Sequence, residues 1–481
     1  MFIGLDLGTT NVKALAVGED GRVAARASAA VRLIHTPDGG VEQDIEEIWA
    51  AALEALEGLA ARVRLADIEA IGVSSQGGAL QMLDKEDRPL GRVVSWLDPR
   101  GRRLGQAMTE RMGSEWFARR VGHGAAAVAA AQLLRLREEQ PGWVAAPNRA
   151  GFVGDVIVGR LCGRRAHDAT SLSLAILYNP WLNRADPEWL DMLGMEEARL
   201  PDLLPATTAA GGLRPGVAAR LGARAGTPVS PAIHDQYASA LGAGAVEAGS
   251  VMFGAGTAWV TLAVTDRLAA PVIPQGFSCS HVAPGLFGQM LSLGNGGSAF
   301  DWARRLMGLK DARPETLDEM MGRVPAGSEG LRFWPFVAAA PAGVAPGATG
   351  RLAGLQLRHG PGHVLRAVAE GLAFELARYL RFYTSAGIEV ERLVMTGGAA
   401  SSQVTPGIVA GVTGAPVSPC VEPDASALGA AILARALARP GESLAGLAAR
   451  MTGAREAIEP GPERAIYARL LEEYVGSLAV R

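Results

Sequence analysis

The feature that most constrains the fold of this chain is a unit of strand, glycine–threonine turn and second strand that occurs twice. The first copy reads "MFIGLDLGTTNVKALAVG" from residue 1, and the second reads "GSVMFGAGTAWVTLAV" from residue 249. In each copy an apolar run reaches a Gly-Thr pair, and alternating apolar residues then resume. Only the first copy carries an acid, Asp6. A pattern that recurs in both halves indicates two related domains.

Composition agrees with two globular domains that act on small molecules. A chain of 481 residues exceeds the size at which single hydrophobic cores stop growing. A hydrophobic content of 49% with 20% charged residues is typical of a folded globular chain. The net charge of -3 supplies no field that would attract nucleic acid or an acidic membrane. We therefore expect neither as a partner.

Cysteine usage and the N-terminus predict a cytoplasmic protein. Cys162, Cys279 and Cys420 are odd in number and far apart, which excludes a full disulfide framework and every C-x-x-C metal spacing. Asp6 interrupts the first apolar run, and no basic segment precedes it, so the run is not a signal peptide. No uninterrupted apolar stretch reaches the roughly 18 residues that a membrane helix needs.

Strand and helix patterns alternate along the chain, which predicts the α/β class. In the first half, "IEAIGVSSQ" and "VSPAIHD" read as buried strands that end in polar residues, and "IEEIWAAALEALEGLAARV" has apolar residues at helical spacing. The strand–turn–strand pattern restarts after "ASALGAGAVEAGS", which places a domain boundary near residue 244. In the second half, "GHVLRAVAEGLAFELARYLRFYTSAG" predicts a long helix, and "RLVMTGGAASS" runs from a strand through two glycines into a helix.

The two turns have the chemistry of phosphate binding. Gly8-Thr9-Thr10 offers N–H groups and hydroxyls, and Asp6 at the strand end could hold a hydrated Mg²⁺. The alternative for each turn is a β-hairpin that uses glycine only for its backbone geometry. Lys13 either reaches phosphate or faces outward from an edge strand. No P-loop and no complete G-x-G-x-x-G motif is present, which leaves an actin-like design in which two related domains clamp ATP.

Longer segments match a known family. The segments "IGLDLGTTNVKALAV", "EQDIEEIWAA", "HDQYASALGAGAVEAGSVMFGAGTAWV", "VMTGGAASS" and "DASALGAAILA" resemble the FGGY carbohydrate kinases, and the similarity runs across nearly the whole chain. The resemblance implies two ribonuclease-H-like domains of the actin/hexokinase superfamily with a nucleotide cleft between them. Residues 1–244 would bind the sugar and supply the catalytic base, and residues 245–481 would bind the nucleotide.

The resemblance also implies the site residues. Asp235 resembles the catalytic base, which accepts the proton of the sugar hydroxyl that attacks the γ-phosphate of ATP, and Asp6 and Asp235 resemble the Mg²⁺ ligands. The implied phosphate and nucleotide contacts are Thr9, Thr10, Lys13, Gly256, Thr257, Gly297, Gly397, Gly398, Ala399 and Ser402. The implied sugar contacts are Gln76, Gly77, Gly78, Trp96, Asp98, Asp235 and Gln236. The implied partner is a sugar or polyol, and the chain could also form a homodimer.

Departures from the family leave the identity of the sugar open. Xylulokinases typically carry Gln-Met-His-Gly where this chain has "QGGA" at residues 76–79. The segment "FWPFVAAAPAGVAPG" carries no charge, and Ala131 and Leu134 stand where a Lys and a Trp are expected. The resemblance still favours a kinase that phosphorylates a hydroxyl of a ketose or polyol, xylulokinase-like rather than glycerol kinase-like. The alternatives are a weakly active sugar-binding relative and an actin-fold ATPase, a chaperone or assembly motor, without a sugar acceptor.

Overall fold

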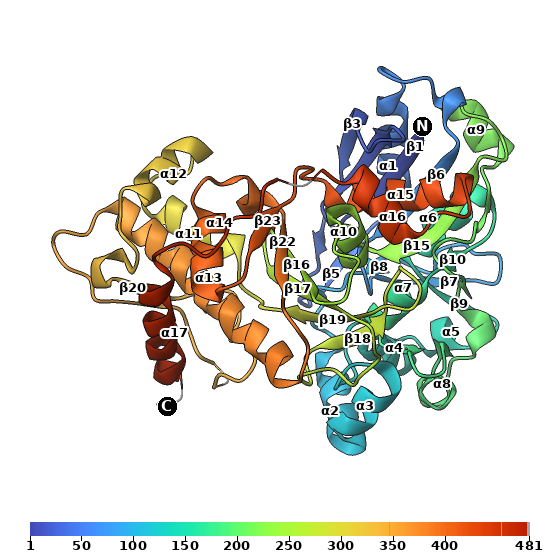
Figure 1. Cartoon of the computed structure of the whole chain (residues 1–481). Helices are drawn as coiled ribbons and strands as arrows, with labels where there is room; N and C mark the ends of the chain where they lie inside the picture. The colour runs from blue at the N-terminus through green and yellow to red at the C-terminus, as the bar shows by residue number, and fades with distance from the viewer. Residues whose placement is uncertain (346, 454, 479–481) are drawn as a thin grey trace. The chain divides into compact units, whose positions relative to one another are not determined.

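A β-sheet flanked by helices forms the centre of each of the two units into which the chain divides (Figure 1). The computed structural model describes residues 1–345, 347–453 and 455–478. The first unit comprises Met1–Val246, Thr265–Gln289 and Asp424–Thr452, and the second comprises Glu247–Val264, Met290–Pro423 and Gly453–Arg481. The predicted α/β class is confirmed. The units interleave along the sequence, and the assignment of separate roles to residues 1–244 and 245–481 stays a prediction.

The main sheet of the first unit combines parallel and antiparallel strands. Its order is β13-β10-β15-β6-β1-β2-β3, and β14 pairs with β15. The strands are β1 (Phe2–Leu7), β2 (Asn11–Val17), β3 (Val23–Ala30), β6 (Ala70–Ser75), β10 (Ala166–His167), β13 (Asp202–Leu203), β14 (Gly211–Gly212) and β15 (Pro228–His234). The centre of the sheet is buried on both faces, which explains why β1 and β6 read as nearly continuous small and apolar runs.

The strand register brings three polar chain segments to one edge of this sheet. Strand β1 runs parallel to β6, with Asp6 opposite Ser74, and β6 runs parallel to β15, with Ser75 opposite His234. The residues that follow β6 and β15, Gln76 and Asp235, therefore leave the sheet at the edge where Asp6 lies. In open α/β sheets this carboxyl edge is where ligands bind.

Helices cover the main sheet, directly or through other helices, and the last two of them come from far along the sequence. These helices are α1 (Ile45–Leu59), α6 (Val153–Cys162), α7 (Ala169–Leu174), α9 (Pro215–Leu221), α10 (Asp235–Ala243), α15 (Ala425–Ala438) and α16 (Leu444–Met451). Helix α15 packs on β1, β6 and α10 through glycine contacts. A Cβ on Gly4 would lie 1.7 Å from the Ala427 carbonyl oxygen, and one on Gly72 would lie 1.8 Å from that of Ala430. Only glycine at these two positions lets α15 approach so closely.

A smaller sheet stands beside the main sheet of the first unit. Its order is β4 (Ile34–His35), β5 (Val41–Gln43), β8 (Val93–Val94), β7 (Leu80–Leu83) and β9 (Arg149–Phe152). The remaining elements of this unit are α2 (Arg102–Met112), α3 (Ser114–Val121), α4 (Val128–Glu139), α5 (Pro141–Val144), α8 (Pro187–Leu193), β11 (Tyr178–Asn179), β12 (Arg184–Ala185) and β18 (Phe277–Ser280).

The second unit repeats the hairpin-plus-parallel-strand arrangement of the first. Strands β16 (Ser250–Ala255) and β17 (Trp259–Thr265) form an antiparallel hairpin, and β22 (Arg392–Thr396) runs parallel to β16 with β23 (Val417–Pro419) beside it. The other elements of the second half are β19 (Phe287–Ser292), β20 (Arg332–Trp334), β21 (Arg351–Ala353), α11 (Gly297–Leu306), α12 (Pro314–Gly322), α13 (Pro361–Ser385), α14 (Thr405–Thr413) and α17 (Arg464–Leu478). The long helix predicted from its periodicity is α13, which contacts α11, α12 and α14.

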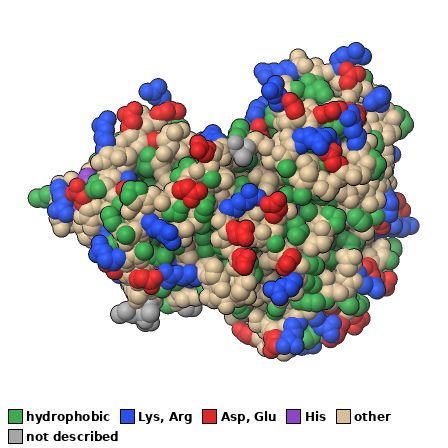
Figure 2. All heavy atoms as spheres, viewed as in Figure 1, with side chains coloured by type: hydrophobic (Ala, Val, Ile, Leu, Met, Phe, Trp, Pro, Cys, Tyr) green, Lys and Arg blue, Asp and Glu red, His purple; other side chains and the backbone are tan. Residues whose placement is uncertain are grey.

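The surface carries charges of both signs. Figure 2 shows Lys and Arg side chains interspersed with Asp and Glu side chains over the face in view. This mixture agrees with the net charge of -3. Among the described residues, no helix is both long enough and apolar enough to cross a bilayer.

Candidate active site

Asp235 lies at the carboxyl edge of the main sheet, with one carboxylate oxygen open. It is the first residue of α10, immediately after β15, and not the last residue of the strand. Its Oδ1 accepts a hydrogen bond of 3.3 Å from Gln236 Nε2, and His234 Nε2 lies 3.1 Å from the same oxygen. No hydrogen bond or ion pair among the described residues reaches Oδ2, and the side chain is 28% exposed. The oxygen Oδ2 can therefore meet a ligand.

Asp6 is the second carboxylate at this edge. Its Oδ1 accepts hydrogen bonds from Ser74 Oγ at 2.9 Å and from Ser426 Oγ at 2.8 Å. Burial, and then the negative charge of Asp235, raise the pKa of Asp6 to about 6, and burial alone raises the pKa of Asp235 to about 6. Two buried carboxylates, one of which is harder to ionise because of the charge of the other, form a site that a hard cation would stabilise.

His234 is buried beside Asp235 as a neutral group. Burial lowers the pKa of its imidazole to about 3. Its Nδ1 has no hydrogen-bond partner within the described part of the chain. The imidazole therefore stays neutral at physiological pH and packs beside Asp235 as an uncharged group.

Thr9 belongs to a closed ring of hydrogen bonds with two glutamines. Its hydroxyl donates to Gln76 Oε1 at 3.3 Å and accepts from Trp96 Nε1 at 3.0 Å. Its carbonyl accepts from Gln43 Nε2 at 2.9 Å, and Gln43 Oε1 accepts from Gln76 Nε2 at 3.0 Å. The structure thus brings together Thr9, Gln76 and Trp96, which the sequence assigned to phosphate and sugar, and adds Gln43.

Lys13 already has an anionic partner. Its Nζ lies 2.7 Å from Asp424 Oδ1, and Arg26 Nη1 lies 3.0 Å from Asp424 Oδ2. Lys13 stands opposite Asp6 in the β1–β2 register. Contact between Lys13 and phosphate stays a prediction, and it would require exchange of this ion pair. Thr10 is exposed beside the turn, where its hydroxyl accepts from Asn11 Nδ2 at 3.2 Å.

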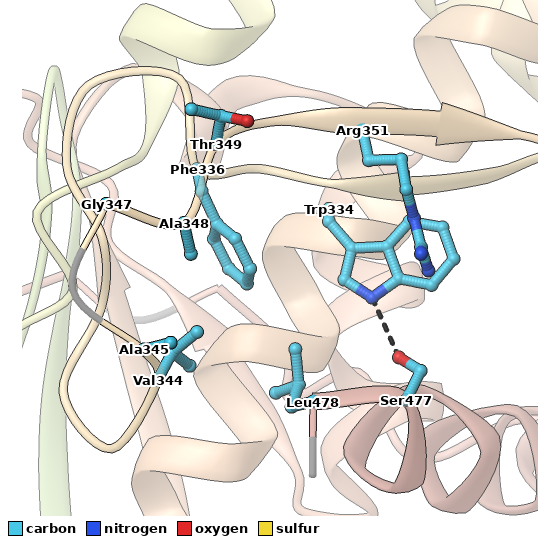
Figure 3. A pocket seen from close by; sticks show the side chains of 10 residues that line it. All are labelled: Trp334, Phe336, Val344, Ala345, Gly347, Ala348, Thr349, Arg351, Ser477 and Leu478. Carbon is cyan, nitrogen blue, oxygen red and sulfur yellow. Dashed lines mark hydrogen bonds between the residues drawn. The ribbon is translucent and has the colours of Figure 1, made fainter. Parts of the chain in front are cut away.

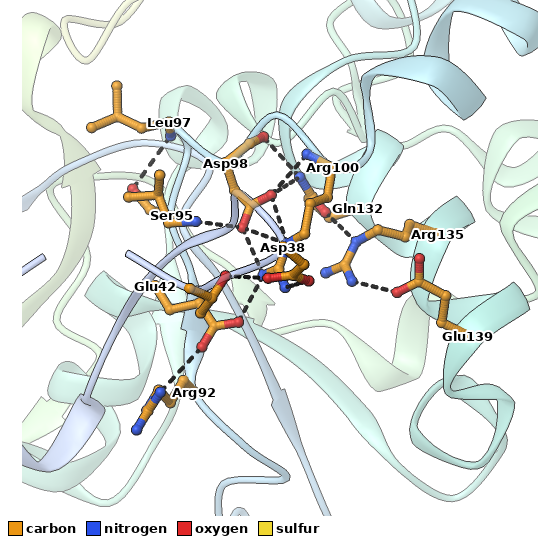
Figure 4. Close-up of polar contacts among 12 residues, drawn as sticks. Asp38, Glu42, Arg92, Ser95, Leu97, Asp98, Arg100, Gln132, Arg135 and Glu139 are labelled. Carbon is orange, nitrogen blue, oxygen red and sulfur yellow. Dashed lines mark hydrogen bonds and ion pairs between the residues drawn. The ribbon is translucent and has the colours of Figure 1, made fainter. Parts of the chain in front are cut away.

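Asp98 is kept from solvent by its ion pair with Arg100 (Figure 4). Its side chain is fully buried, and its carboxylate accepts from three Arg100 N–H groups and from the Val41 N–H. Gln132 Nε2 donates to its carbonyl oxygen at 3.0 Å. Direct contact with a sugar stays a prediction for Asp98, whereas its anchoring of strand β5 through Val41 is visible in the structure.

The two glycines after Gln76 are surrounded by other side chains of the first unit. A Cβ on Gly77 would lie 2.6 Å from His234 Cδ2, and one on Gly78 would lie 2.2 Å from Val128 Cγ1. Gly78 has a φ of 72°, which favours glycine. His234 and Val128 therefore fill space that larger residues in the "QGGA" segment would need, and sugar contact by these glycines stays a prediction.

The second unit holds a cavity of about 720 Å³ beside its own Gly-Thr turn. Six of the sequence-predicted nucleotide residues line it: Gly256, Thr257, Gly297, Gly398, Ala399 and Ser402. Gly397 lies against the turn, because a Cβ there would be 2.8 Å from the Ala255 carbonyl carbon. Apolar side chains of α11, α12 and α13, which suit a flat base, line the rest of the wall together with the charged side chains of Asp301, Arg304, Arg305 and Asp318.

A smaller cavity of about 140 Å³ lies in the uncharged segment that departs from the family pattern (Figure 3). The Arg351 guanidinium covers the Trp334 ring at 3.6 Å, and Trp334 Nε1 donates to Ser477 Oγ at 2.9 Å. None of the sequence-predicted site residues lines it. This segment therefore builds local packing in the second unit.

Gln43 and Ser426 are among the residues of the site that were missed in the sequence. Gln43 stands in the quoted segment "EQDIEEIWAA", and Ser426 stands in "DASALGAAILA". A polar residue at the end of a short strand and a serine in the first turn of a helix are common, so neither signals a contact across the chain.

Fold, acid pair and glycine turns define the class of a two-domain phosphotransferase, and the comparisons with known proteins agree. The N-terminal domain of the FGGY family of carbohydrate kinases matches residues 1–242, and its C-terminal domain matches residues 251–438. The chain therefore belongs to the FGGY family of carbohydrate kinases, for which ATP is the phosphate donor.

Relatives span nearly the whole chain. The xylulose kinase of Escherichia coli is 28% identical over 92% of this chain and 91% of its own length. A glycerol kinase of Trichlorobacter lovleyi is 29% identical over 90% of this chain and 89% of its own. The crystal structure of xylulose kinase from Rhodospirillum rubrum superposes with a TM-score of 0.90 at 26% identity and covers 99% of this chain and 98% of that one.

Proposed function

We propose that this carbohydrate kinase transfers the γ-phosphate of ATP to a hydroxyl of a ketose or polyol, with xylulose-like ketoses as the first candidates. The observation that carries the proposal is the open Oδ2 of Asp235 at the same sheet edge as Asp6 and Gln76. The names of the relatives that span the chain support a ketose or polyol acceptor.

In the proposed reaction, the acceptor hydroxyl gives its proton to Asp235 Oδ2 as its oxygen forms a bond to the γ-phosphorus. The bond from that phosphorus to the β–γ bridging oxygen breaks, and ADP leaves. Asp235 performs this step only when ionised. Thr10, the backbone of the Gly8–Thr10 turn and the residues that line the cavity of the second unit are the proposed contacts of the nucleotide.

We propose Asp6 and Asp235 as the protein ligands of Mg²⁺. Carboxylate oxygens are the ligands that Mg²⁺ prefers, and Mg²⁺ keeps several waters and binds substrate phosphates. No group of three or more His, Cys, Asp and Glu side chains in the described residues forms a closed metal cage, which fits a cation that shares its coordination with water and phosphate. Bound there, Mg²⁺ would neutralise charge on the phosphates.

The test is ADP release from Mg-ATP over a panel of ketoses, their polyols and glycerol, with acceptor-free protein as the control. Stimulation by one class of acceptor, with formation of its phosphate ester, supports the proposal. Full ATP hydrolysis without any acceptor would contradict it and favour an actin-fold ATPase. A cytoplasmic location and a homodimer remain part of the proposal, to be checked by fractionation and by light scattering.

A further inference from the structure

The ring of hydrogen bonds around Thr9 joins residues of two predicted roles. Gln76 and Trp96 belong to the predicted sugar wall, and Thr9 belongs to the predicted phosphate turn. The residue that closes the ring is Gln43, which is completely buried at the end of β5. A buried side-chain amide is retained at low cost only when its donor and acceptor are both satisfied.

The orientation of the Gln43 amide is fixed by its partners. Its Nε2 donates to the Thr9 carbonyl at 2.9 Å, and its Oε1 accepts from Gln76 Nε2 at 3.0 Å. A flipped amide would set donor against donor at Gln76 and acceptor against acceptor at Thr9. Gln43 therefore also fixes the orientation of the Gln76 side-chain amide, whose Oε1 accepts from the Thr9 hydroxyl.

Strand β5 is itself held in place. Val41 donates its N–H to Asp98 Oδ2 at 2.9 Å and accepts from the Ser95 N–H at 3.0 Å. Figure 4 shows that Asp98 is in turn paired with the guanidinium of Arg100. The ion pair of Asp98 and Arg100 thus holds Val41, and Gln43 lies two residues beyond Val41 on the same strand.

Thr9 has one hydroxyl proton, and the ring directs it at Gln76. An acceptor that binds Gln76 Oε1 or the half-exposed Trp96 indole through its own hydroxyls would change the partners of the Thr9 hydroxyl. The proton of Thr9 could then turn toward a phosphate oxygen. A ligand on the sugar side would thus alter a donor on the phosphate side.

We propose that Gln43 is a positioning residue that couples acceptor binding at Gln76 and Trp96 to phosphate binding at the Gly8–Thr10 turn. The inference rests on the proposed function, because it needs a polyhydroxy acceptor. Gln43 touches neither ligand and acts through Thr9 and Gln76. Its removal should uncouple the two ligands while each still binds alone.

The experiment measures the affinity for a non-hydrolysable Mg-ATP analogue by calorimetry, with and without the best acceptor of the panel. In the wild-type enzyme we expect the acceptor to tighten analogue binding by about fivefold or more, the usual lower range of coupling between sites. In Gln43→Leu the ratio should fall below about twofold, with the affinity for the analogue alone little changed. Gln43→Glu keeps the acceptor for Gln76 but loses the donor to Thr9, and it should lie between the two.

Gln81→Leu is the matched control, because Gln81 is also completely buried in the first unit and donates only to the carbonyls of Met82 and Gly91. It should lower stability as Gln43→Leu does and keep the full coupling ratio. Equal coupling in Gln43→Leu and wild type would overturn the inference. Loss of coupling in both leucine variants would also overturn it, since general loosening would then suffice.

A second measurement needs no acceptor. The indole N–H of Trp96, assigned with Trp96→Phe, should shift in the ligand-free ¹⁵N spectrum of Gln43→Leu and not in that of Gln81→Leu. An unshifted signal in Gln43→Leu would contradict the ring. A wild-type enzyme that phosphorylates no acceptor would refute the proposed function instead, and the spectrum separates these two failures.

Discussion

The two Gly-Thr turns share a backbone plan and differ in what surrounds them. At the first turn, Thr9 is tied to Gln43, Gln76 and Trp96, and an acid lies two residues before Gly8. At the second turn, Thr257 is exposed, and Gly254 stands two residues before Gly256. Its bonds are backbone bonds, from Gly297 N–H to the Gly256 carbonyl at 2.9 Å and from Ser298 N–H to the Thr257 carbonyl at 3.0 Å.

This difference indicates how a duplicated hairpin can serve two tasks. The first copy fixes side chains beside two carboxylates, which suits a turn that takes part in chemistry. The second copy presents Gly256 and Thr257 to a cavity of about 720 Å³, which suits a turn that receives a bulky ligand. Four predictions test the division, from the largest expected effect to the smallest.

The largest effect should follow from Asp235→Asn in the first unit. Loss of the base should lower kcat by about 10²–10⁴, the usual scale for a positioned acid–base group, with little change in ATP affinity. Steady-state kinetics with the best acceptor measures it. Asp202→Asn, an exposed acid paired with Arg164, is the control and should match wild type. A near-normal kcat in Asp235→Asn would remove that residue from the mechanism.

The threonines of the two turns should differ in their contribution to stability. Thr9→Val removes the partner of buried Gln76 Oε1 and should lower the free energy of unfolding by about 1–3 kcal/mol. Thr257→Val changes an exposed side chain and should stay within about 0.5 kcal/mol of wild type. Urea unfolding compares the pair, and equal losses would show that the side-chain ring does not distinguish the turns.

Adjacent glycines of the second unit should separate ligand binding from folding. A Cβ on Gly398 meets no atom within 4 Å, so Gly398→Val should fold normally and weaken ATP binding by about tenfold as the side chain enters the cavity. Gly397 has a φ of 84° and lies against the turn, so Gly397→Val should destabilise the unit itself. Calorimetry and thermal unfolding report the two effects. Normal ATP affinity in Gly398→Val would place the nucleotide elsewhere.

The acid pair should leave a signature in the pH dependence of stability of metal-free protein. Asp6 and Asp235 have pKa values of about 6 in the folded chain, above the usual 3.8, so the folded state binds more protons than the unfolded state between these values. Their contribution to stability is therefore present below about pH 4 and is lost as the pH rises through about 6.

Asp6→Asn should flatten this part of the stability profile and raise the melting temperature at pH 7. Asp155 and Asp168, whose pKa values burial also raises, contribute equally in both proteins, so the difference between the two profiles isolates Asp6. Parallel profiles would contradict the raised pKa of Asp6.

Much of this comparison could be predicted from the sequence, because it lies in local pattern. The duplicated hairpin, the long helix α13 and the glycine loop after β22 follow from periodicity and from glycine positions. The resemblance to the FGGY family then predicted six nucleotide-binding residues that line one cavity of the second unit. Where local residue types determine local backbone, sequence reasoning succeeds.

Contacts between distant segments were not accessible in the same way. Nothing in the local sequence links Lys13 to Asp424 or Ser426 to Asp6, since these pairs depend on where α15 packs. The full enclosure of Asp98 by Arg100 could not be predicted either, because a lone acid after a strand reads equally as a ligand contact or as an anchor. Such pairings are fixed by tertiary packing alone.

The packing of α15 also has a consequence for synthesis of the chain. Strands β1 and β6 present bare glycine backbone at Gly4 and Gly72, and the helix that covers them begins at Ala425. On the ribosome, the first unit therefore cannot complete its core until most of the chain has emerged. Until then, the face of β1 and β6 that α15 later covers stays exposed in the nascent chain, and chaperones bind exposed surfaces of this kind.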